Sequence, residues 1–217
     1  MKKRIAINGF GRIGRLTLRN LLKNKNIEVV GINDLTDNKT LAHLFKYDSI
    51  HGTFPGTVSA DEDSIKINDH VIPVFSSRDP QTLPWASLKV DIVLECTGIF
   101  KKRVDCQKHR DAGAKKIILS APSSDADVPT VVLGVNDELL HVDDWMISNA
   151  SCTTNCLAPL VKVIEENWQI SSGVMTTIHA YTGDQNIHDA PHNDLRRARA
   201  AAINMVPTST GLSLIHI

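Results

Sequence analysis

Short apolar runs alternate with segments of helical apolar spacing through the first part of the chain. Such runs are typical of strands buried on both faces, as in a parallel sheet covered by helices. The expected strands are residues 3–8, 27–33, 71–75 (within a hairpin), 90–94, 116–119, 130–133 and 145–147. The expected helices are residues 13–23, 40–47 and 103–112. The pattern therefore predicts an α/β fold, a Rossmann-type doubly wound parallel sheet.

The pattern changes around residues 148–151. We expect a helix at 152–167, a long strand at 173–181, and then a polar, basic segment at 188–199. The domain boundary is therefore placed near residue 150, with one domain at 1–150 and the start of a second at 151–217.

A glycine triplet marks the first strand-to-helix junction. Gly9, Gly11 and Gly14 form GFGRIG. In dinucleotide-binding folds, the first glycine permits a tight turn, the second admits a pyrophosphate, and the third allows close helix–strand packing. The helix that follows presents its N–H groups to the anion. Taken alone, the triplet could also be a glycine-rich turn without a ligand.

Asp34 ends the second strand, about twenty residues beyond the triplet, where a ribose-binding carboxylate is expected. It could instead cap the next helix, since capping residues cluster at 34–38. A carboxylate at this position repels a 2′-phosphate, so the sequence favours NAD over NADP.

Cys152 falls at the start of the second-domain helix, within SNASCTTNC. The free N–H groups and the dipole of a helix N-terminus lower a thiol's pKa, which favours the thiolate needed for nucleophilic attack. The alternative is a packed cysteine, and we expect Cys156, one turn later, to be buried in that way. His179, in MTTIHAY, is the candidate base. Its sequence distance from Cys152 does not establish contact.

The segment DLRRAR, residues 194–199, brings three arginines near Thr182 and the threonines at 208–210. Guanidinium groups, hydroxyls and backbone N–H groups are typical of a phosphate site. The alternative is a solvated helix face.

The composition sets limits on the function. The 217 residues are 42% hydrophobic and carry 24 basic and 24 acidic side chains, so no global charge points to nucleic acid or a membrane. The N-terminus lacks the apolar core of a secretory signal, and no apolar run reaches the ~18 residues of a membrane span. We therefore expect a cytoplasmic protein. The four cysteines lack a CxxC pair, so we expect reduced thiols and no metal.

Taken together, the motifs resemble the glyceraldehyde-3-phosphate dehydrogenase family from about Arg4 to Gly211. The matching segments are INGFGRIGR, NDLTD, KYDSIHG, ECTGIF, AGAKKIILSAP, SNASCTTNCLAP, TTIHAYTGDQ and PHNDLRRARAAAINMVPTSTG. The resemblance implies an NAD-binding domain followed by the first part of an α+β catalytic domain. It also implies oxidation and phosphorylation of glyceraldehyde 3-phosphate by NAD and inorganic phosphate in glycolysis, and assembly as a homotetramer.

The resemblance also implies a role for each matching position. Cys152 attacks the aldehyde to form a thiohemiacetal and then a thioester, and His179 takes the proton. The implied NAD-binding residues are Asn8, Gly9, Gly11, Arg12, Ile13, Gly14, Asp34, Arg78 and Ser120. The implied substrate-binding residues are Ser151, Cys152, Thr153, Thr182, Arg197, Thr210 and Gly211. Leu35 and Pro191 accompany NAD preference in this family.

The chain departs from the family pattern at two places. Cys96 stands where many members have serine, and residues 212–217 (LSLIHI) match nothing in the family, whose chains continue further. We therefore expect a C-terminally truncated member. The alternatives are an NAD-binding module without turnover and an erythrose-4-phosphate dehydrogenase.

Overall fold

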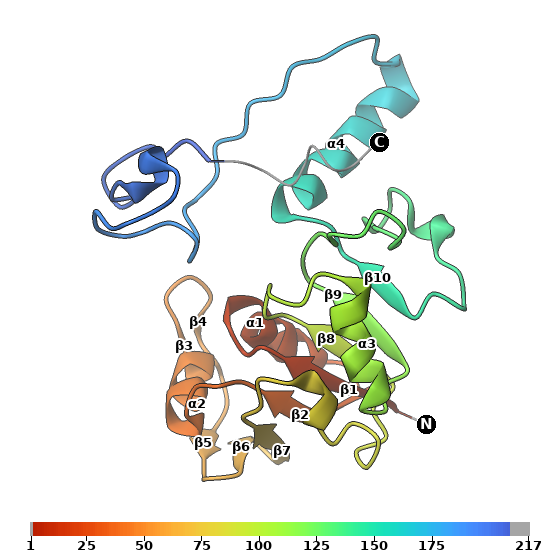
Figure 1. The fold of residues 1–217 in the computed structure, drawn as a ribbon, viewed down its shortest axis with the longest axis vertical. Helices are drawn as coiled ribbons and strands as arrows, with labels where there is room; N and C mark the ends of the chain where they lie inside the picture. The colour runs from red at the N-terminus through yellow and green to blue at the C-terminus, as the bar shows by residue number, and fades with distance from the viewer. Residues whose placement is uncertain (1, 209–217) are drawn as a thin grey trace. The chain divides into compact units, whose positions relative to one another are not determined.

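A computed structural model describes residues 2–208 (Figure 1). The chain divides into two compact units, Met1–Ala150 and Ser151–Ile217. Each unit is described by itself.

The first unit is built on an eight-stranded sheet in the order β10-β9-β8-β1-β2-β7-β6-β5. Its strands are β1 (Lys3–Asn8), β2 (Ile27–Asn33), β5 (Val58–Ala60), β6 (Ser64–Ile67), β7 (His70–Phe75), β8 (Ile92–Glu95), β9 (Lys116–Leu119) and β10 (Met146–Ser148). Pairing is parallel from β10 across to β7, whereas β6 pairs antiparallel with both β5 and β7. The expected α/β Rossmann-type sheet is confirmed, and the strand order reverses at β1.

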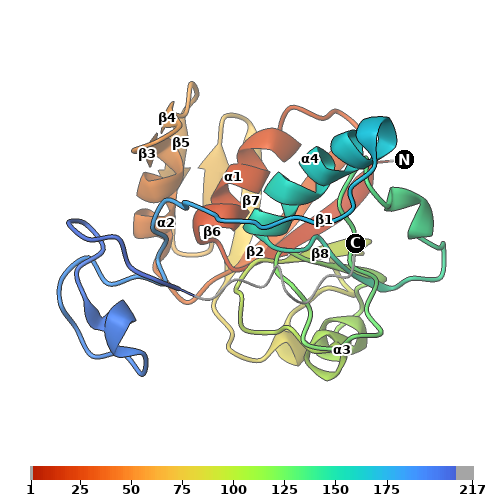
Figure 2. The same cartoon turned by 90° about the horizontal axis from the view of Figure 1, so that it is seen from above.

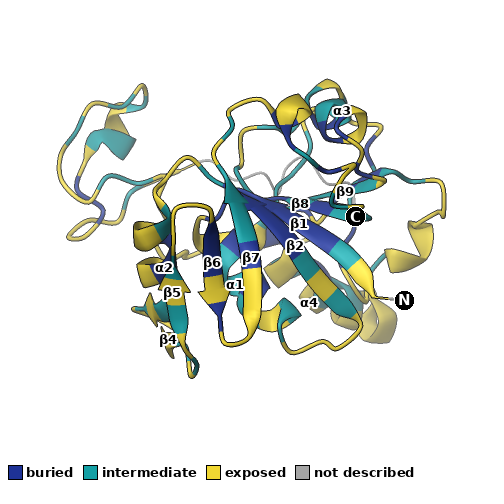
Figure 3. Ribbon diagram, turned by 90° about the horizontal axis from the view of Figure 1, so that it is seen from below, coloured by how far each residue is buried: buried dark blue, intermediate teal, exposed yellow. Residues whose placement is uncertain are grey.

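Helices cover both faces of this sheet. They are α1 (Arg12–Leu21), α2 (Asn38–Lys46) and α3 (Arg103–Asp111), and α1 and α3 lie on opposite faces (Figure 2). Side chains of one strand alternate between two cores: Ala6 packs in the cluster that includes Cys106 of α3, and Ile7 packs with Leu18 of α1. The central strands are accordingly buried along most of their length (Figure 3).

Smaller elements complete the first unit. A two-stranded ribbon joins β3 (Tyr47–Asp48) to β4 (Gly52–Thr53), and two 3-10 turns, η1 and η2, span Pro80–Thr82 and Asp137–Leu139. The strand expected at 130–133 is wrong. Thr130 makes one isolated bridge to Ser148, and the chain then turns at Gly134, where φ is +78°. Val131 and Val132 are buried without belonging to a ladder, which explains the apolar run.

The second unit contains α4 (Cys152–Trp168) and a 3-10 turn, η3 (Leu195–Ala198). Ser151 caps α4 by accepting a hydrogen bond from Thr154 N at 3.1 Å. The strand expected at 173–181 is wrong, because a strand requires a hydrogen-bonded neighbour and no described residue pairs with this segment. Much of the apolar side of α4 is exposed, and Trp168 at its end is 73% exposed.

Candidate functional site

The glycine turn after β1 is shaped so that only glycine fits at two of its positions. Gly9 has φ +90°, and a Cβ there would lie 2.7 Å from the backbone nitrogen of Thr97. A Cβ on Gly14 would overlap the carbonyl oxygen of Gly9. By contrast, no atom lies within 4 Å of a Cβ built on Gly11. Backbone atoms therefore fill the space beside Gly9 and Gly14, whereas the space beside Gly11 is open, which fits the close approach of a pyrophosphate there.

The N-terminus of α1 lies next to this open position. Gly11 is its N-cap residue and has no capping side chain, so side chains do not satisfy the first-turn N–H groups at the cap. These groups are available to an anion. Ile13 is exposed here, and Arg12 is exposed and forms two hydrogen bonds to Asp48, at 2.5 and 3.2 Å.

Asp34 follows β2 and holds the glycine turn. Its carboxylate accepts from the backbone N–H of Phe10 at 2.7 Å and of Thr36 at 2.9 Å. The helix-cap alternative for Asp34 is wrong, because Asp37 caps α2 by accepting from Thr40 N at 2.9 Å. A carboxylate has about four acceptor positions, so Asp34 retains capacity for ribose hydroxyls.

The other three residues predicted to contact the cofactor lie near the carboxyl ends of the strands. Asn8 is buried, and its side-chain amide is used within the protein, by Asn33 and Glu95. Ser120 follows β9 and donates its backbone N–H to the carbonyl of Glu95 at 3.0 Å. Arg78 is exposed in the loop after β7.

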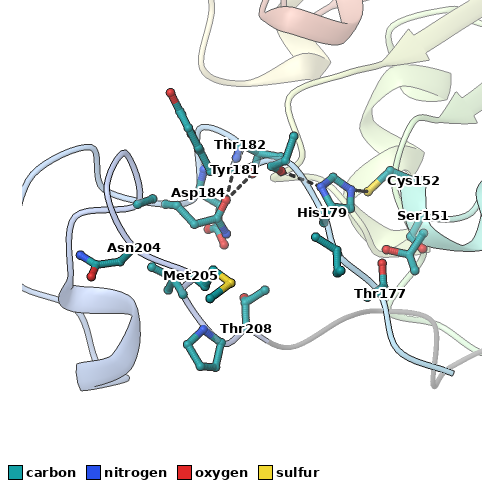
Figure 4. Close-up of a pocket in the computed structure, with 17 residues that line it drawn as sticks. Ser151, Cys152, Thr177, His179, Tyr181, Thr182, Asp184, Asn204, Met205 and Thr208 are labelled. Carbon is teal, nitrogen blue, oxygen red and sulfur yellow. Dashed lines mark hydrogen bonds between the residues drawn. The ribbon is translucent and has the colours of Figure 1, made fainter. Parts of the chain in front are cut away.

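The second unit brings Cys152 and His179 together. Cys152 is the first residue of α4, and its Sγ lies 3.2 Å from His179 Nε2 (Figure 4). His179 Nδ1 lies 2.6 Å from the carbonyl oxygen of Ala180. Because a carbonyl only accepts, Nδ1 carries a proton, and Nε2 is left to accept the thiol proton. This is the arrangement of an activated nucleophile with an oriented base.

The environment of the pair favours charge separation. Burial alone raises the pKa of Cys152, but the hydrogen bond and charge of His179, together with hydrogen bonds from Thr153, lower that pKa below its ordinary value. The hydrogen bond to the carbonyl of Ala180, followed by the Cys152 interaction, raises the pKa of His179. The two shifts have opposite directions, so they favour a thiolate beside an imidazolium.

The other cysteines have different surroundings. Burial raises the pKa of Cys96 to about 11 and that of Cys106 to about 12. All four cysteines are unpaired, as expected. The expected burial of Cys156 is wrong, because this residue lies on an exposed part of α4.

A cavity of about 690 Å³ opens in front of the cysteine. Of the predicted substrate residues, Ser151, Cys152, Thr153 and Thr182 line it. Arg197 does not line it. The guanidinium group of Arg197 is paired with Asp184, and its buried Nε has no hydrogen-bond partner among residues 2–208. Thr210 and Gly211 lie outside the described residues.

Two residues that line the cavity, Asp184 and Gln185, were not among the predicted site residues. Gln185 Oε1 accepts from the backbone N–H and the hydroxyl of Thr182, at 2.7 and 3.1 Å, and so fixes the position of that threonine at the cavity wall. Asp184, beside it, pairs with Arg197. Both residues lie in the motif TGDQ, and its run of polar side chains could have indicated them from the sequence.

Residues 2–208 contain neither a candidate membrane helix nor a candidate metal cluster. Within that range, no helix has the length and apolar character needed to cross a membrane. Nor does any group of three or more His, Cys, Asp or Glu side chains in the described structure form a potential metal site.

The sheet and its glycine turn define a Rossmann-type dinucleotide-binding protein, here followed by a thiol–imidazole site. Residues 3–103 match the family model described as the glyceraldehyde 3-phosphate dehydrogenase NAD binding domain, and residues 151–214 match the model of that family's C-terminal domain. The chain belongs to the glyceraldehyde-3-phosphate dehydrogenase family. The match confirms NAD as the cofactor of the first unit.

Individual relatives agree with this assignment. The chain is 57% identical to glyceraldehyde-3-phosphate dehydrogenase 1 of Bacillus cereus over 209 residues, 96% of this chain and 62% of that protein. It is 55% identical to the enzymes of Mycoplasma pneumoniae and Thermotoga maritima, over 96% of this chain and 62% and 63% of theirs. The chain therefore spans less than two thirds of the length of these relatives.

Proposed function

We propose that this chain carries the cofactor-binding and nucleophilic parts of an NAD-dependent phosphorylating glyceraldehyde-3-phosphate dehydrogenase. The observation that carries the proposal is the Cys152–His179 pair, with Sγ 3.2 Å from Nε2, at a helix N-terminus in a chain of this family. Bound NAD supplies an acceptor for hydride. The substrates are D-glyceraldehyde 3-phosphate and inorganic phosphate.

The residues of the second unit perform the proposed acyl chemistry. Cys152 attacks the aldehyde carbon as a thiolate, and the imidazolium of His179 protonates the resulting alkoxide to give a thiohemiacetal. The neutral His179 then takes this hydroxyl proton back as hydride leaves. The thioester on Cys152 then reacts with inorganic phosphate, and the acyl phosphate departs as the cysteine thiolate is released. Backbone N–H groups at the start of α4 are suited to stabilise the oxyanion.

Substrate phosphate recognition is assigned to the residues implied by the family motif. These are Thr182, Arg197, Thr210 and Gly211, with Ser151 and Thr153 beside the nucleophile. The guanidinium group of Arg197 pairs with Asp184, so the assignment of Arg197 rests on the family motif.

In the first unit, NAD binding is assigned to Gly9, Gly11, Arg12, Ile13, Gly14 and Asp34 together with Asn8, Arg78 and Ser120. The homotetramer and the cytoplasmic location remain predictions, which light scattering and cell fractionation would test.

The test is NADH formation by this chain from glyceraldehyde 3-phosphate, NAD and phosphate. We expect NADH release that requires phosphate and is abolished in Cys152→Ser. Binding of NAD without any NADH formation would instead assign the chain as an NAD-binding module. Faster turnover of erythrose 4-phosphate than of glyceraldehyde 3-phosphate would instead identify the chain as an erythrose-4-phosphate dehydrogenase.

A further inference from the structure

A chain of buried polar side chains lies beneath the glycine turn, and the proposed chemistry does not use it. Glu95, at the end of β8, is 1% exposed, and His109 of α3 is 0% exposed. Glu95 Oε2 lies 2.5 Å from Asn8 Nδ2 and 3.1 Å from His109 Nε2. Glu95 Oε1 accepts from the backbone N–H of Thr97 at 2.8 Å and from its hydroxyl at 2.5 Å. Burying a carboxylate so completely is costly, so its protonation state matters.

The backbone fixes the protons at one end of this network. Ser77 N–H donates to Asn33 Oδ1 at 2.8 Å, so the amide nitrogen of Asn33 faces Asn8. That nitrogen donates to Asn8 Oδ1 at 2.7 Å. The remaining group of Asn8, its NH₂, therefore points at Glu95 and donates to it.

An indole fixes the protons at the other end. The Nε1–H of Trp85 is only a donor, and it donates to His109 Nδ1 at 3.0 Å. Nδ1 is therefore unprotonated, and this assignment places the single proton of a neutral imidazole on Nε2, which faces Glu95. The hydroxyl of Thr97 accepts from Ile99 N at 3.1 Å and turns its own proton to Glu95.

Every group that contacts the carboxylate of Glu95 is thus a donor without a formal charge. Of these groups only the Thr97 hydroxyl could also accept a proton, and the three N–H groups that converge on the carboxyl favour its ionised form. The result is a fixed negative charge at the carboxyl ends of β1 and β8. Dinucleotides bind at such ends, where the strand order reverses. The residue after Glu95 also packs against the glycine turn, because a Cβ on Gly9 would lie 2.8 Å from the carbonyl carbon of Cys96.

The two redox forms of the cofactor differ in the charge that this anion would meet. The oxidised nicotinamide ring is a cation and the reduced ring is neutral, whereas both forms carry the same pyrophosphate. We propose that Glu95 is a specificity-determining residue whose buried negative charge raises the affinity for NAD⁺ relative to NADH. The inference rests on the proposed NAD binding by the first unit.

The test requires a variant that removes the charge without creating a new clash. In Glu95→Gln the new NH₂ would meet both the NH₂ of Asn8 and the Nε2–H of His109. Asn8→Ala removes the first donor, and Trp85→Phe frees Nδ1, so the His109 proton can move there and Nε2 can accept from the glutamine. The matched pair is therefore the double variant Asn8→Ala/Trp85→Phe and the same double variant with Glu95→Gln added, which share the same cavity and differ in the charge. Both are measured at about pH 8.5, where an ordinary imidazole is neutral.

Dissociation constants for NAD⁺, NADH and ADP-ribose are measured by titration calorimetry on the full chain. Between the two variants, we expect the preference for NAD⁺ over NADH to fall about 5- to 10-fold, the size of a partly screened interaction between two unit charges. ADP-ribose lacks the nicotinamide ring, so its affinity should not weaken by more than about twofold.

Three results would overturn the proposal. An unchanged ratio would show that the charge does not reach the ring, and parallel weakening of all three ligands would show a purely structural role. Glu95→Asp keeps the charge, so a loss of the NAD⁺ preference in that variant would also contradict it, whether or not the triple variant folds. Failure of the unaltered chain to bind any of the three ligands would refute the proposed NAD binding itself, and this inference with it.

Discussion

Replacement of His179 by glutamine tests the central feature of the second unit, the stabilisation of the Cys152 thiolate. The hydrogen bond and charge of His179 contribute to the lowered pKa of Cys152, so removing the imidazole should return that pKa toward the ordinary thiol value. The variant should therefore lose thiolate at neutral pH and regain it as the pH rises.

The size of the effect follows from the ionised fraction. An ordinary thiol is about 3% ionised at pH 7, so the lowered pKa can raise the thiolate fraction by at most roughly 30-fold, and removing His179 would lose that gain. The more basic thiolate is intrinsically more nucleophilic, with a Brønsted coefficient of about 0.4–0.5, which offsets part of that loss. We expect alkylation of Cys152 by iodoacetamide at pH 7 to slow by about 2- to 4-fold. Near pH 10 both cysteines are ionised, so the variant should then react at least as fast as the unaltered protein.

The assay is peptide mass mapping of the rate of alkylation against pH. Cys96 and Cys106, with pKa values raised to about 11 and about 12, provide slow internal references, and exposed Cys156 should also react more slowly than Cys152. His188→Gln, at an exposed histidine of the same unit, is the matched control and should leave the profile unchanged. The reasoning is refuted if His179→Gln alkylates with the wild-type pH profile.

Three further predictions concern the local structure, and each is tested by urea unfolding. Gly9→Ala should lower the free energy of unfolding by about 3 kcal/mol, because a Cβ at φ +90° meets the Thr97 backbone. The control Gly11→Ala should lower it by less than about 1 kcal/mol, and equal losses in the two variants would contradict the packing of the turn. Ser151→Ala should destabilise α4 by about 1 kcal/mol through loss of its cap, with helicity followed by circular dichroism, and an unchanged midpoint would argue against this cap. Asp48 accepts hydrogen bonds from His51 N and Arg12, which lower its pKa. Its stabilisation is therefore fully present above about pH 4 and declines as the pH falls further. Asp48→Asn should cost about 1 kcal/mol at pH 7 and progressively less below about pH 4, and a pH-independent cost would oppose this.

Much of the first unit could be predicted from local pattern. The strands β1, β2 and β9 have the predicted bounds, because each apolar run gives way to a polar residue, Asn8, Asn33 or Ser120, at the end of the strand. The pattern failed at 130–133, where two buried valines pack without a ladder and Leu133 is 76% exposed. It failed at 173–181 for a related reason, since β-propensity alone supplies no pairing partner.

The candidate site was only partly predictable. The position of Cys152 at a helix start follows from SNASC and the apolar run after it, but its contact with His179 depends on how the chain returns after α4. The network around Glu95 was missed because its meaning depends on hydrogen bonds between residues as distant as Asn8 and Glu95, which are 87 positions apart. Sequence spacing carries no information about such contacts.

The tryptophans offer a way to watch the two units separately. Trp85, in the first unit, is fully buried, donates its indole N–H to His109 and stacks against that ring. Trp168, in the second, is largely exposed at the end of α4. The third tryptophan, Trp145, is partly buried in the first unit, so the measurement uses a Trp145→Phe background. A soluble quencher such as acrylamide then reaches Trp168 directly and Trp85 only when the first unit opens. Fluorescence with and without quencher would thus resolve whether the two units unfold in one step or in two.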